Sequence, residues 1–322
     1  MKPRWPIGAG LLLSTALALA LLWTPDRDPA WLAERYLGSP ADRVEVDGVR
    51  LHVRVDGPAD APAVLFLHGF GASLHTWEPW AQALSADFRV VRLDLPGSGL
   101  SPPDPARDYT DARSQALIEA LLDRLGIAST HVVGHSMGGR LAWQLAAARP
   151  ARVKRLVLLA PDGFASPGFE YDRAPEVPAS LQLMRFALPR WVLKMGLEPA
   201  YADASVMTGP LLDRYHDLLL APGARQAMLD RMAQAVLTDP VPRLRRITAP
   251  TLLLWGEQDA MIPVDNASDY LAAMRGSTLV RLPGIGHLEI ALDTGAATIE
   301  HGSFVSEADI HHAIEEAGFG VR

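Results

Sequence analysis

The middle of the chain carries the sequence Gly134-His135-Ser136-Met137-Gly138-Gly139. This stretch follows a short apolar run at residues 131–133, typical of a buried strand, and leads into a helical pattern at residues 139–148. A Gly-x-Ser-x-Gly pentapeptide between a strand and a helix puts its serine on a tight turn, where the flanking glycines leave room for a strained backbone. The turn exposes the hydroxyl, so Ser136 is the candidate nucleophile of the chain.

Apolar runs and helical patterns alternate on both sides of this motif. Runs typical of strands buried on both faces lie at residues 63–67, 90–93, 131–133, 156–159, 251–255 and 278–280. Helical patterns lie between several of them, at residues 111–125, 139–148 and 264–274. This alternation predicts an α/β fold with a mostly parallel sheet and helices on both of its faces. Upstream, Asp47-Gly48 separates two short runs, 44–46 and 51–55, and predicts a β-hairpin.

One long segment interrupts the alternation. Residues 164–246 contain no strand-like run and are rich in Leu, Met, Pro and Arg at helical spacing. An insertion with adaptable side chains, between two sheet strands and with candidate site residues on either side, predicts a helical cap over the site. The alternative is a second structural domain without a role in binding. The segment also holds three basic residues that form either a solvated face or a site for a substrate carboxylate: Arg185, Arg190 and Lys194.

Two further residues complete a candidate catalytic triad. Asp259 comes just after the apolar run at 251–255, and His287 lies on the loop after the last run. A nucleophile, an orienting carboxylate and a general base occur in this chain order in α/β-hydrolases. Each of the three residues follows its own predicted strand, which favours a triad of Ser136, Asp259 and His287 over a structural role for His287 alone.

Two backbone amides are candidates for binding the negative charge that develops on oxygen in acyl transfer. The N–H of Met137 opens the helix after Ser136. The N–H of Phe70 lies in His68-Gly69-Phe70-Gly71, where the glycines allow the backbone to approach a ligand closely. Phe70 and Met137 are therefore the predicted oxyanion-hole residues.

From about residue 44 to residue 287 the sequence resembles the α/β-hydrolase superfamily, in its capped subgroup of small esterases, carbon–carbon bond hydrolases and haloperoxidase-like enzymes. Five motifs carry the resemblance, in the order typical of the family: His68-Gly69-Phe70-Gly71, Asp94-Leu95-Pro96-Gly97-Ser98-Gly99-Leu100-Ser101, residues 134–139, residues 255–259 and Gly286-His287. The resemblance implies the α/β-hydrolase fold, the Ser-His-Asp triad and the oxyanion pair. It does not imply the substrate.

The residues at and before the nucleophile narrow the expected chemistry. Haloalkane dehalogenases and epoxide hydrolases of the superfamily carry Asp where this chain has Ser136, which disfavours both activities. Carbon–carbon bond hydrolases often carry Asn where this chain has His135. We therefore expect a serine hydrolase that cleaves a carboxylic ester of a small, mainly apolar substrate through an acyl-enzyme. The alternatives are a carbon–carbon bond hydrolase of meta-cleavage products and, more distantly, a non-catalytic binding protein, which would gain nothing from keeping His287.

The composition of the chain excludes several classes of function. Its 322 residues include 37 acidic and 30 basic ones, for a net charge of −7, and no basic stripe, which argues against a nucleic-acid partner. There is no cysteine, which excludes disulfides, thiolate metal sites and a cysteine nucleophile. A serine triad needs no cofactor, so none is expected, and the predicted partner is a small-molecule ester rather than another protein.

The N-terminal part of the chain predicts a membrane segment. Lys2 and Arg4 precede an uncharged stretch at residues 5–24 that is rich in Leu and Ala. About 20 apolar residues in a helix cross a bilayer core of roughly 30 Å. Trp5 and Trp23 stand at the two ends of the stretch, where aromatic rings favour the membrane interface.

We expect this segment to be an uncleaved anchor at residues 1–25, which puts the rest of the chain on the non-cytoplasmic side, periplasmic or extracellular. The alternatives are a secreted protein, cleaved at the signal site Ala18-Leu19-Ala20, and a buried soluble helix. Residues 26–43 are expected to be a linker near the membrane surface. The remaining domains are the hydrolase core, residues 44–163 and 247–322, and the cap, residues 164–246.

The last part of the chain departs from the family pattern. Residues 288–322 stand where members of the family usually close with a helix. Residues 297–321 loosely resemble the second half of a heavy-metal-associated module, but its loop with paired cysteines is absent, so no metal is assigned. Three histidines of this tail are expected to be solvated surface residues: His301, His311 and His312.

Overall fold

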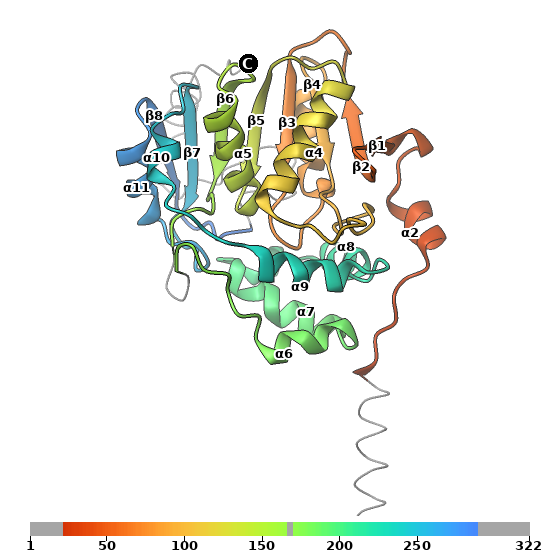
Figure 1. Ribbon diagram of the computed structural model, residues 1–322. Coiled ribbons are helices and arrows are strands. Elements are labelled where there is room, and N and C mark those ends of the chain that lie inside the picture. Colours follow the sequence, from red (N-terminus) through yellow and green to blue (C-terminus); the bar gives the residue numbers. More distant parts are fainter. Residues whose placement is uncertain (1–21, 166–169, 289–322) are drawn as a thin grey trace, which may run out of the picture.

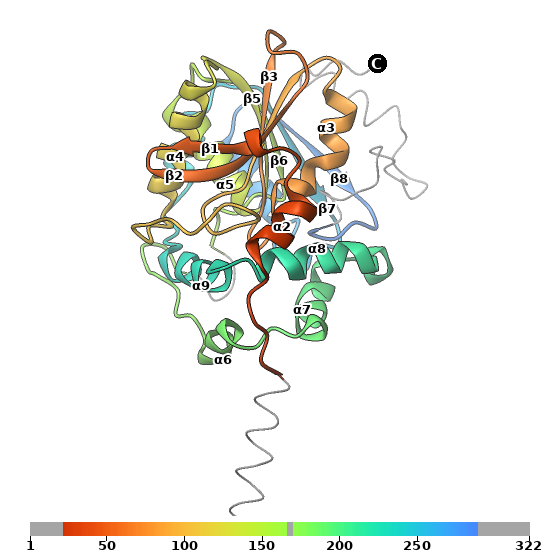
Figure 2. The ribbon, with the colours of Figure 1, turned by 90° about the vertical axis from the view of Figure 1, so that its right-hand side faces the viewer.

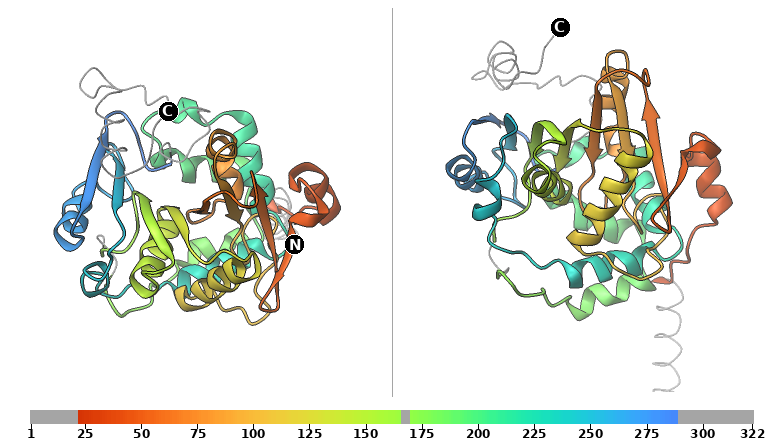
Figure 3. Two further views of the ribbon diagram at one scale, coloured as in Figure 1. Left: turned by 90° about the horizontal axis from the view of Figure 1, so that it is seen from above. Right: turned by 45° about the horizontal axis from the view of Figure 1, so that its top comes forward.

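The computed structural model describes residues 22–165 and 170–288 of the chain (Figure 1). Within these residues eight strands form one sheet, in the order β1-β2-β4-β3-β5-β6-β7-β8. From β4 to β8 all neighbouring strands are parallel, and β1 and β2 add two antiparallel strands at one edge. Helices cover both faces of this sheet, with α4 and α5 on one side and α3 on the other (Figures 2 and 3). The predicted α/β fold is confirmed.

Each predicted apolar run falls within one of the strands. The strands span Arg43–Val46 (β1), Val49–Asp56 (β2), Ala63–Leu67 (β3), Arg89–Leu93 (β4), Thr130–His135 (β5), Val153–Leu159 (β6), Thr251–Gly256 (β7) and Ser277–Leu282 (β8). β3 and β7 are buried along their whole length, as expected of strands covered on both faces. The hairpin of β1 and β2 turns at Asp47 and Gly48, whose φ angles of 46° and 78° are the left-handed conformation that a two-residue hairpin requires.

The helices outside the insertion flank the sheet. They span Pro29–Tyr36 (α2), Pro40–Asp42 (η1, a short 3₁₀ helix), Leu74–Trp77 (η2), Glu78–Leu84 (α3), Asp111–Arg124 (α4), Met137–Ala148 (α5) and Asn266–Ala273 (α11). α4, α5 and α11 match the three predicted helical patterns. Trp77, Trp143 and Trp255 are fully buried in one large core between these helices and the sheet. Dense packing of this kind holds the strand ends, and the loops that follow them, in fixed positions.

The segment between β6 and β7 is helical where the structure describes it. It contains Ala179–Gln182 (α6), Leu183–Arg185 (η3), Arg190–Leu197 (α7), Glu198–Ala200 (η4), Ala204–Val206 (η5), Gly209–Leu219 (α8), Ala224–Gln234 (α9) and Val241–Leu244 (α10). α6 to α9 lie together beyond one end of the sheet (Figure 1). A small core that includes Leu188, Leu212 and Tyr215 joins α7, α8 and α9. Leu244 of α10 packs in the main core instead, so the last helix of the insertion belongs with the sheet.

The two ends of the chain lie largely outside the described residues. Of the predicted anchor at 1–25 the structure describes residues 22–25, and of the atypical tail at 288–322 it describes Leu288. In the parts of the chain that the structure describes, no helix is long and apolar enough to cross a membrane. The anchor and the surface positions of the tail histidines stay predictions.

The segment predicted as a linker lies on the cap. Residues 26–43 contain α2, whose Leu32 and Tyr36 pack against α8. The Tyr36 hydroxyl donates a hydrogen bond of 2.8 Å to Asp217 in α8, and Arg27 pairs with the same carboxylate at 2.9 Å. α2 is therefore packed as part of the folded domain, because its apolar side and its polar side both have partners there.

Candidate active site

Ser136 stands at the turn from β5 to α5. Its φ of 53° and ψ of −120° are a strained conformation for a residue other than glycine. The surrounding backbone is close: a Cβ on Gly138 would lie 2.2 Å from the carbonyl oxygen of Leu67, and one on Gly134 would lie 2.4 Å from that of Gly138. Glycine at both positions lets the chain close the turn that presents the Ser136 side chain.

Asp259 and His287 form a buried, hydrogen-bonded pair. Oδ2 of Asp259 lies 2.7 Å from Nδ1 of His287, and the two residues are 6% and 3% exposed. The other carboxylate oxygen accepts hydrogen bonds from the amides of Met261 (2.9 Å) and Ile262 (2.8 Å). Because these amides hold the carboxylate, the His287 tautomer with its proton on Nδ1 is favoured, and Nε2 is left to act as a base.

Ser136 and His287 line one cavity under the cap. The volume of this cavity is about 740 Å³, and Phe70 and Met137 also contribute to its wall. Most of the cap residues that line it are apolar, among them Val177, Pro178, Leu181, Met232, Ala235 and Leu237, and four are charged: Glu170, Arg173, Glu176 and Arg231. The structure therefore brings the candidate nucleophile, the candidate base and both candidate oxyanion residues to one cavity, with Asp259 bonded behind His287.

The loop that carries Phe70 is held by a buried histidine. Nδ1 of His68 donates to the backbone oxygen of Gly69 at 2.8 Å, and Nε2 accepts from the amide of Leu95 at 3.1 Å. Burial lowers the pKa of His68, so the ring is neutral and keeps one donor and one acceptor. Among the described residues no carbonyl accepts the amide of Phe70 or of Met137, so both N–H groups are available to a ligand.

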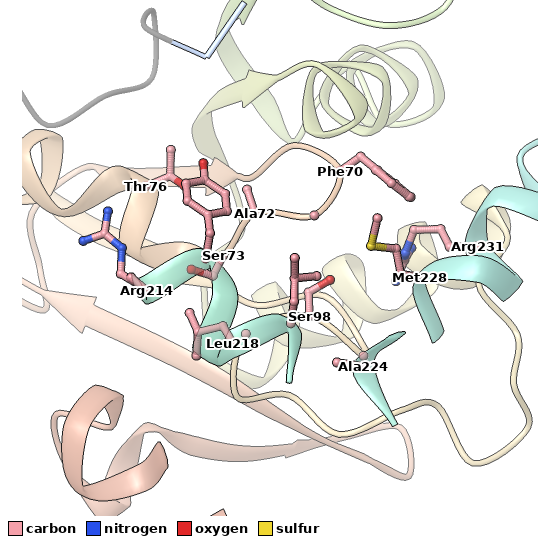
Figure 4. Close-up of a pocket in the computed structure, with 15 residues that line it drawn as sticks. Phe70, Ala72, Ser73, Thr76, Ser98, Arg214, Leu218, Ala224, Met228 and Arg231 are labelled. Atoms are coloured by element: carbon pink, nitrogen blue, oxygen red, sulfur yellow. The ribbon is translucent and has the colours of Figure 1, made fainter. Parts of the chain in front are cut away.

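A second, much smaller cavity lies beside the first. Its volume is about 20 Å³, and its wall includes Ala72, Ser73, Thr76, Ser98, Leu218 and Ala224 (Figure 4). Phe70 and Arg231 line both cavities, and Figure 4 shows them with Met228 at one end of the smaller one. Ala72, just after the candidate oxyanion loop, packs in the small core of the cap.

A comparison with models of protein families identifies the family of this chain. The model described as "alpha/beta hydrolase fold" matches residues 62–292, which is more than half of the chain. The chain belongs to the α/β-hydrolase family. The match ends just beyond His287 and includes both the insertion and the strands on either side of it.

Relatives of this α/β-hydrolase differ in their chemistry. The chain is 32% identical over 257 residues to 2-hydroxy-6-oxononadienedioate/2-hydroxy-6-oxononatrienedioate hydrolase of Paraburkholderia xenovorans, across 76% of this chain and 86% of that protein. It is 34% identical over 273 residues to the dihydrolipoyllysine-residue acetyltransferase component of the acetoin cleaving system of Cupriavidus necator, of which it spans 67%. Among solved structures it is similar to a membrane phospholipase A, with 25% identity, a TM-score of 0.67, and 93% and 96% of the two chains covered.

His135, directly before the candidate nucleophile, holds the loop of His287. Its Nε2 lies 2.9 Å from the backbone oxygen of His287, and the two ring centroids are 4.7 Å apart. Burial, and to a smaller extent the neighbouring His287, lowers the pKa of His135 well below its usual range. The ring is therefore neutral, and its Nε2–H donates to the carbonyl. Sequence reasoning missed this contact, because the partner lies 152 residues further along the chain.

Arg231 of α9 is a buried cation on the wall of the large cavity that sequence reasoning also missed. One of its terminal nitrogens donates to the backbone oxygen of Pro96 at 2.8 Å, and its guanidinium lies 5.2 Å from the ring centre of Tyr109. Neither of these partners is a carboxylate, whereas Arg140 on the same wall pairs with Asp162. Burial lowers the pKa of Arg231 to about 10, so its side chain is still charged at neutral pH.

The three basic residues singled out from the sequence lie on the cap surface instead. Arg190 pairs with Asp213 at 2.5 Å, and Lys194 pairs with Glu198 at 3.5 Å. Arg185 donates to a backbone oxygen of its own turn at 3.1 Å. Since none of the three lines the large cavity, the solvated face is the better interpretation of this cluster.

Proposed function

We propose that this α/β-hydrolase is a serine hydrolase that cleaves a carboxylic ester of a small, mainly apolar substrate through an acyl-enzyme. One observation carries the proposal. The buried pair of His287 and Asp259, joined at 2.7 Å, opens on the same cavity as Ser136 at its strained turn. A base with a fixed tautomer on the same cavity as a serine hydroxyl is the arrangement that acyl transfer needs.

The proposed reaction has two halves that use the same groups. Ser136 Oγ attacks the ester carbonyl while Nε2 of His287 takes its proton, and the carbonyl oxygen becomes an oxyanion that the amides of Phe70 and Met137 bind. His287 then returns the proton to the leaving alcohol, which departs and leaves Ser136 acylated. A water, deprotonated by His287, attacks the acyl group. His287 then returns this proton to Ser136 Oγ as the acyl bond breaks, which releases the acid and restores the enzyme. Asp259 stays ionised throughout and holds the imidazole in place.

The lining of the cavity supports an apolar substrate. Leu181, Met232 and Leu237 of the cap face the wall that holds Ser136. Apolar groups gain by leaving water for such a wall, and a charged acyl group without a counter-charge pays for its desolvation. A solved structure that resembles this chain is named a membrane phospholipase A, an enzyme class that hydrolyses ester bonds.

A second candidate function is hydrolysis of a carbon–carbon bond in a substrate that bears a carboxylate. Arg231 favours it: in the described parts of the chain no carboxylate pairs with this buried guanidinium, which would bind an anionic group entering the cavity. The similarity to a dienedioate hydrolase is in line with this interpretation. A panel of neutral esters, esters with a free carboxylate and dienoic ring-fission products separates the two. The ester proposal predicts the highest kcat/KM on a neutral ester.

A fluorophosphonate probe tests the proposed function directly. We expect the wild-type chain to be labelled at Ser136, located by mass spectrometry, and Ser136→Ala to remain unlabelled with its folding intact. Turnover of Ser136→Ala should fall on the order of 10⁶-fold, as it does when subtilisin loses its nucleophile. Ser98→Ala is the matched control, since Ser98 lines only the smaller cavity and should leave labelling unchanged. Activity of Ser136→Ala within tenfold of wild type, or a wild-type chain that stays unlabelled, would overturn the proposal.

We also propose that residues 5–24 anchor the chain in a membrane, with the hydrolase domain on the non-cytoplasmic side. The support is the uncharged stretch itself, with Lys2 and Arg4 before it. Full-length protein should then sediment with membranes and resist a high-salt wash, because salt does not screen apolar burial. A mature chain that begins at Leu21 would instead identify a cleaved signal and a secreted protein.

A further inference from the structure

Several large apolar side chains are exposed at one place on the cap. Leu183 in η3 is 64% exposed, Phe186 just after it is 50% exposed, and Trp23 is 58% exposed. The rings of Trp23 and Phe186 are stacked, with their centroids 6.0 Å apart. Leu22 and Leu181, neighbours of these residues in the sequence, are exposed as well. We call these five residues the cap-tip patch.

Hydrogen bonds hold the start of the described chain against this patch. The amide of Thr24 donates to the backbone oxygen of Phe186 at 2.9 Å, and the Thr24 hydroxyl oxygen accepts from the amide of Leu188 at 3.0 Å. The buried Arg225 of α9 donates to the backbone oxygen of Thr24 at 2.8 Å and pairs with Asp26 at 2.6 Å. Figures 1 and 2 place this end of the described chain beside α6 and α7. The described part of the chain therefore begins at the cap-tip patch.

The face of α7 next to the patch also exposes large apolar side chains. Trp191 and Met195 are one helical turn apart and both exposed, while Leu193 on the opposite side of α7 is buried. Arg190 and Lys194 on this helix are half-exposed and pair with Asp213 and Glu198. Exposed apolar and aromatic side chains beside such polar groups match the headgroup region of a membrane.

A lipid bilayer is the environment that suits both the stretch at residues 5–24 and the cap-tip patch. The stretch at residues 5–24 is apolar and uncharged, so a bilayer is the solvent that favours it over water. A bilayer that takes up this stretch reaches the protein at Trp23, and Trp favours the interface. The bonds at Thr24 then bring Leu183 and Phe186 to the same depth. A single exposed apolar residue is common on protein surfaces. A cluster of them next to the apolar stretch at residues 5–24 indicates an interaction surface.

We propose that the cap-tip patch and the exposed face of α7 form a lipid-binding surface that lies in the headgroup region of a bilayer. Leu181 belongs to the patch and also lines the large cavity. The cavity wall is therefore continuous with the lipid-facing surface, and an ester carried in the bilayer would enter the cavity from this side. This last step rests on the proposed hydrolase function, whereas the lipid contact itself does not.

The absence of cysteine from the chain allows a direct test. Full-length Leu183→Cys, labelled with the environment-sensitive fluorophore NBD, is reconstituted into lipid nanodiscs that contain phosphatidylglycerol and phosphatidylcholine, at one chain per disc. We expect the emission to shift to shorter wavelength and to be quenched by lipids with a nitroxide near the headgroup. Leu271→Cys is the matched control, because Leu271 is an exposed leucine on α11, away from α6 and α7 (Figure 1). Its label should keep the emission of a water-exposed probe.

Three outcomes would overturn the proposal. The first is a label at Leu183→Cys that stays water-exposed and unquenched in the discs. The second is a shift that appears only with two chains per disc, which would make the patch an interface between copies of this chain. If the chain stays outside the discs, the same labelled protein is mixed with vesicles of the same lipids; a quenched, shifted label supports the proposal and an unchanged one is the third contrary outcome. None of these outcomes depends on turnover. The fluorophosphonate probe tests the hydrolase proposal separately, so failure of one proposal can be told from failure of the other.

Discussion

The sheet core and the cap of this α/β-hydrolase are built in different ways. The core is one large cluster in which Trp77, Trp143 and Trp255 are fully buried. The cap has a small cluster of its own and leaves residues such as Leu183 and Trp191 more than half exposed. The candidate catalytic side chains all come from the core, and the cap supplies the opposite wall of the cavity. Dense packing holds the catalytic side chains of the core in fixed positions. The cap buries fewer of its apolar side chains, so these can contact a substrate or another surface.

Several polar contacts join the two regions. Arg107 of the core pairs with Asp230 of α9 at 2.7 Å, and the side chain of Gln234 accepts from the amide of Tyr109 at 2.7 Å. Arg231 adds its bond to a backbone oxygen of the core. Exposed ion pairs and hydrogen bonds of this type contribute only about 1 kcal/mol each, because water replaces them when they break. We therefore expect substitutions in the core to affect chemistry and folding strongly, and comparable substitutions in the cap to affect them weakly.

Between core and cap, the largest effect is expected at Asp259, the carboxylate bonded to His287. Asp259→Asn keeps the shape of the side chain but favours the wrong imidazole tautomer, and should lower kcat about 10⁴-fold, as in the equivalent change of a serine protease. Steady-state kinetics on a neutral ester measures it. Asp269→Asn, an exposed position of α11, is the control and should leave kcat within twofold of wild type. If Asp259→Asn is nearly silent, another carboxylate orients His287, and the next to test are Asp265 and Asp162.

The next prediction compares the effect on stability of replacing a helical glycine in the core and one in the cap. A Cβ on Gly138 of α5 would lie 2.2 Å from the backbone oxygen of Leu67, whereas a Cβ on Gly196 of α7 would meet nothing within 4 Å. Gly138→Ala should lower the free energy of unfolding by about 3 kcal/mol, since neither backbone can move freely. Gly196→Ala should change it by at most about 1 kcal/mol, in the stabilising direction. Urea denaturation measures both, and equal effects would contradict the contrast between core and cap.

A smaller effect near neutral pH concerns a buried histidine of the core, because it develops only as the pH falls. Burial lowers the pKa of His75 to about 4, and its Nε2 lies 3.1 Å from the backbone oxygen of Tyr36. The unfolded chain, in which this pKa is about 6.5, binds more protons between pH 6.5 and pH 4. Stability is therefore full above pH 6.5 and falls as the pH drops to 4, by up to about 3 kcal/mol. Denaturation at a series of pH values should show a flatter curve for His75→Gln than for wild type; parallel curves would assign the loss to other groups.

Local patterns in the sequence determined the fold class and the candidate triad. The strand, the Gly-x-Ser-x-Gly turn and the helix after it lie within about twenty consecutive residues, so neighbours in sequence specify the position of Ser136. Asp259 and His287 each follow a strand of a parallel sheet, and such strands end at one edge, so their order along the chain was enough to nominate them. The structure places these two at 2.7 Å from each other, and their catalytic roles stay predictions.

Only the tertiary structure decided which cap residues face the cavity and which face outward. Arg185, Arg190 and Lys194 looked equivalent in sequence to Arg231, yet Arg231 alone of the four lines the large cavity. Short helices joined by turns can pack in many orientations, and a basic residue on a helix carries no local signal of the side it will present. The same holds for the docking of α2 on the cap, which depends on Asp217, 181 residues from Tyr36. Contacts across such distances arise from packing of the whole chain, because no local preference of either segment encodes the position of the other.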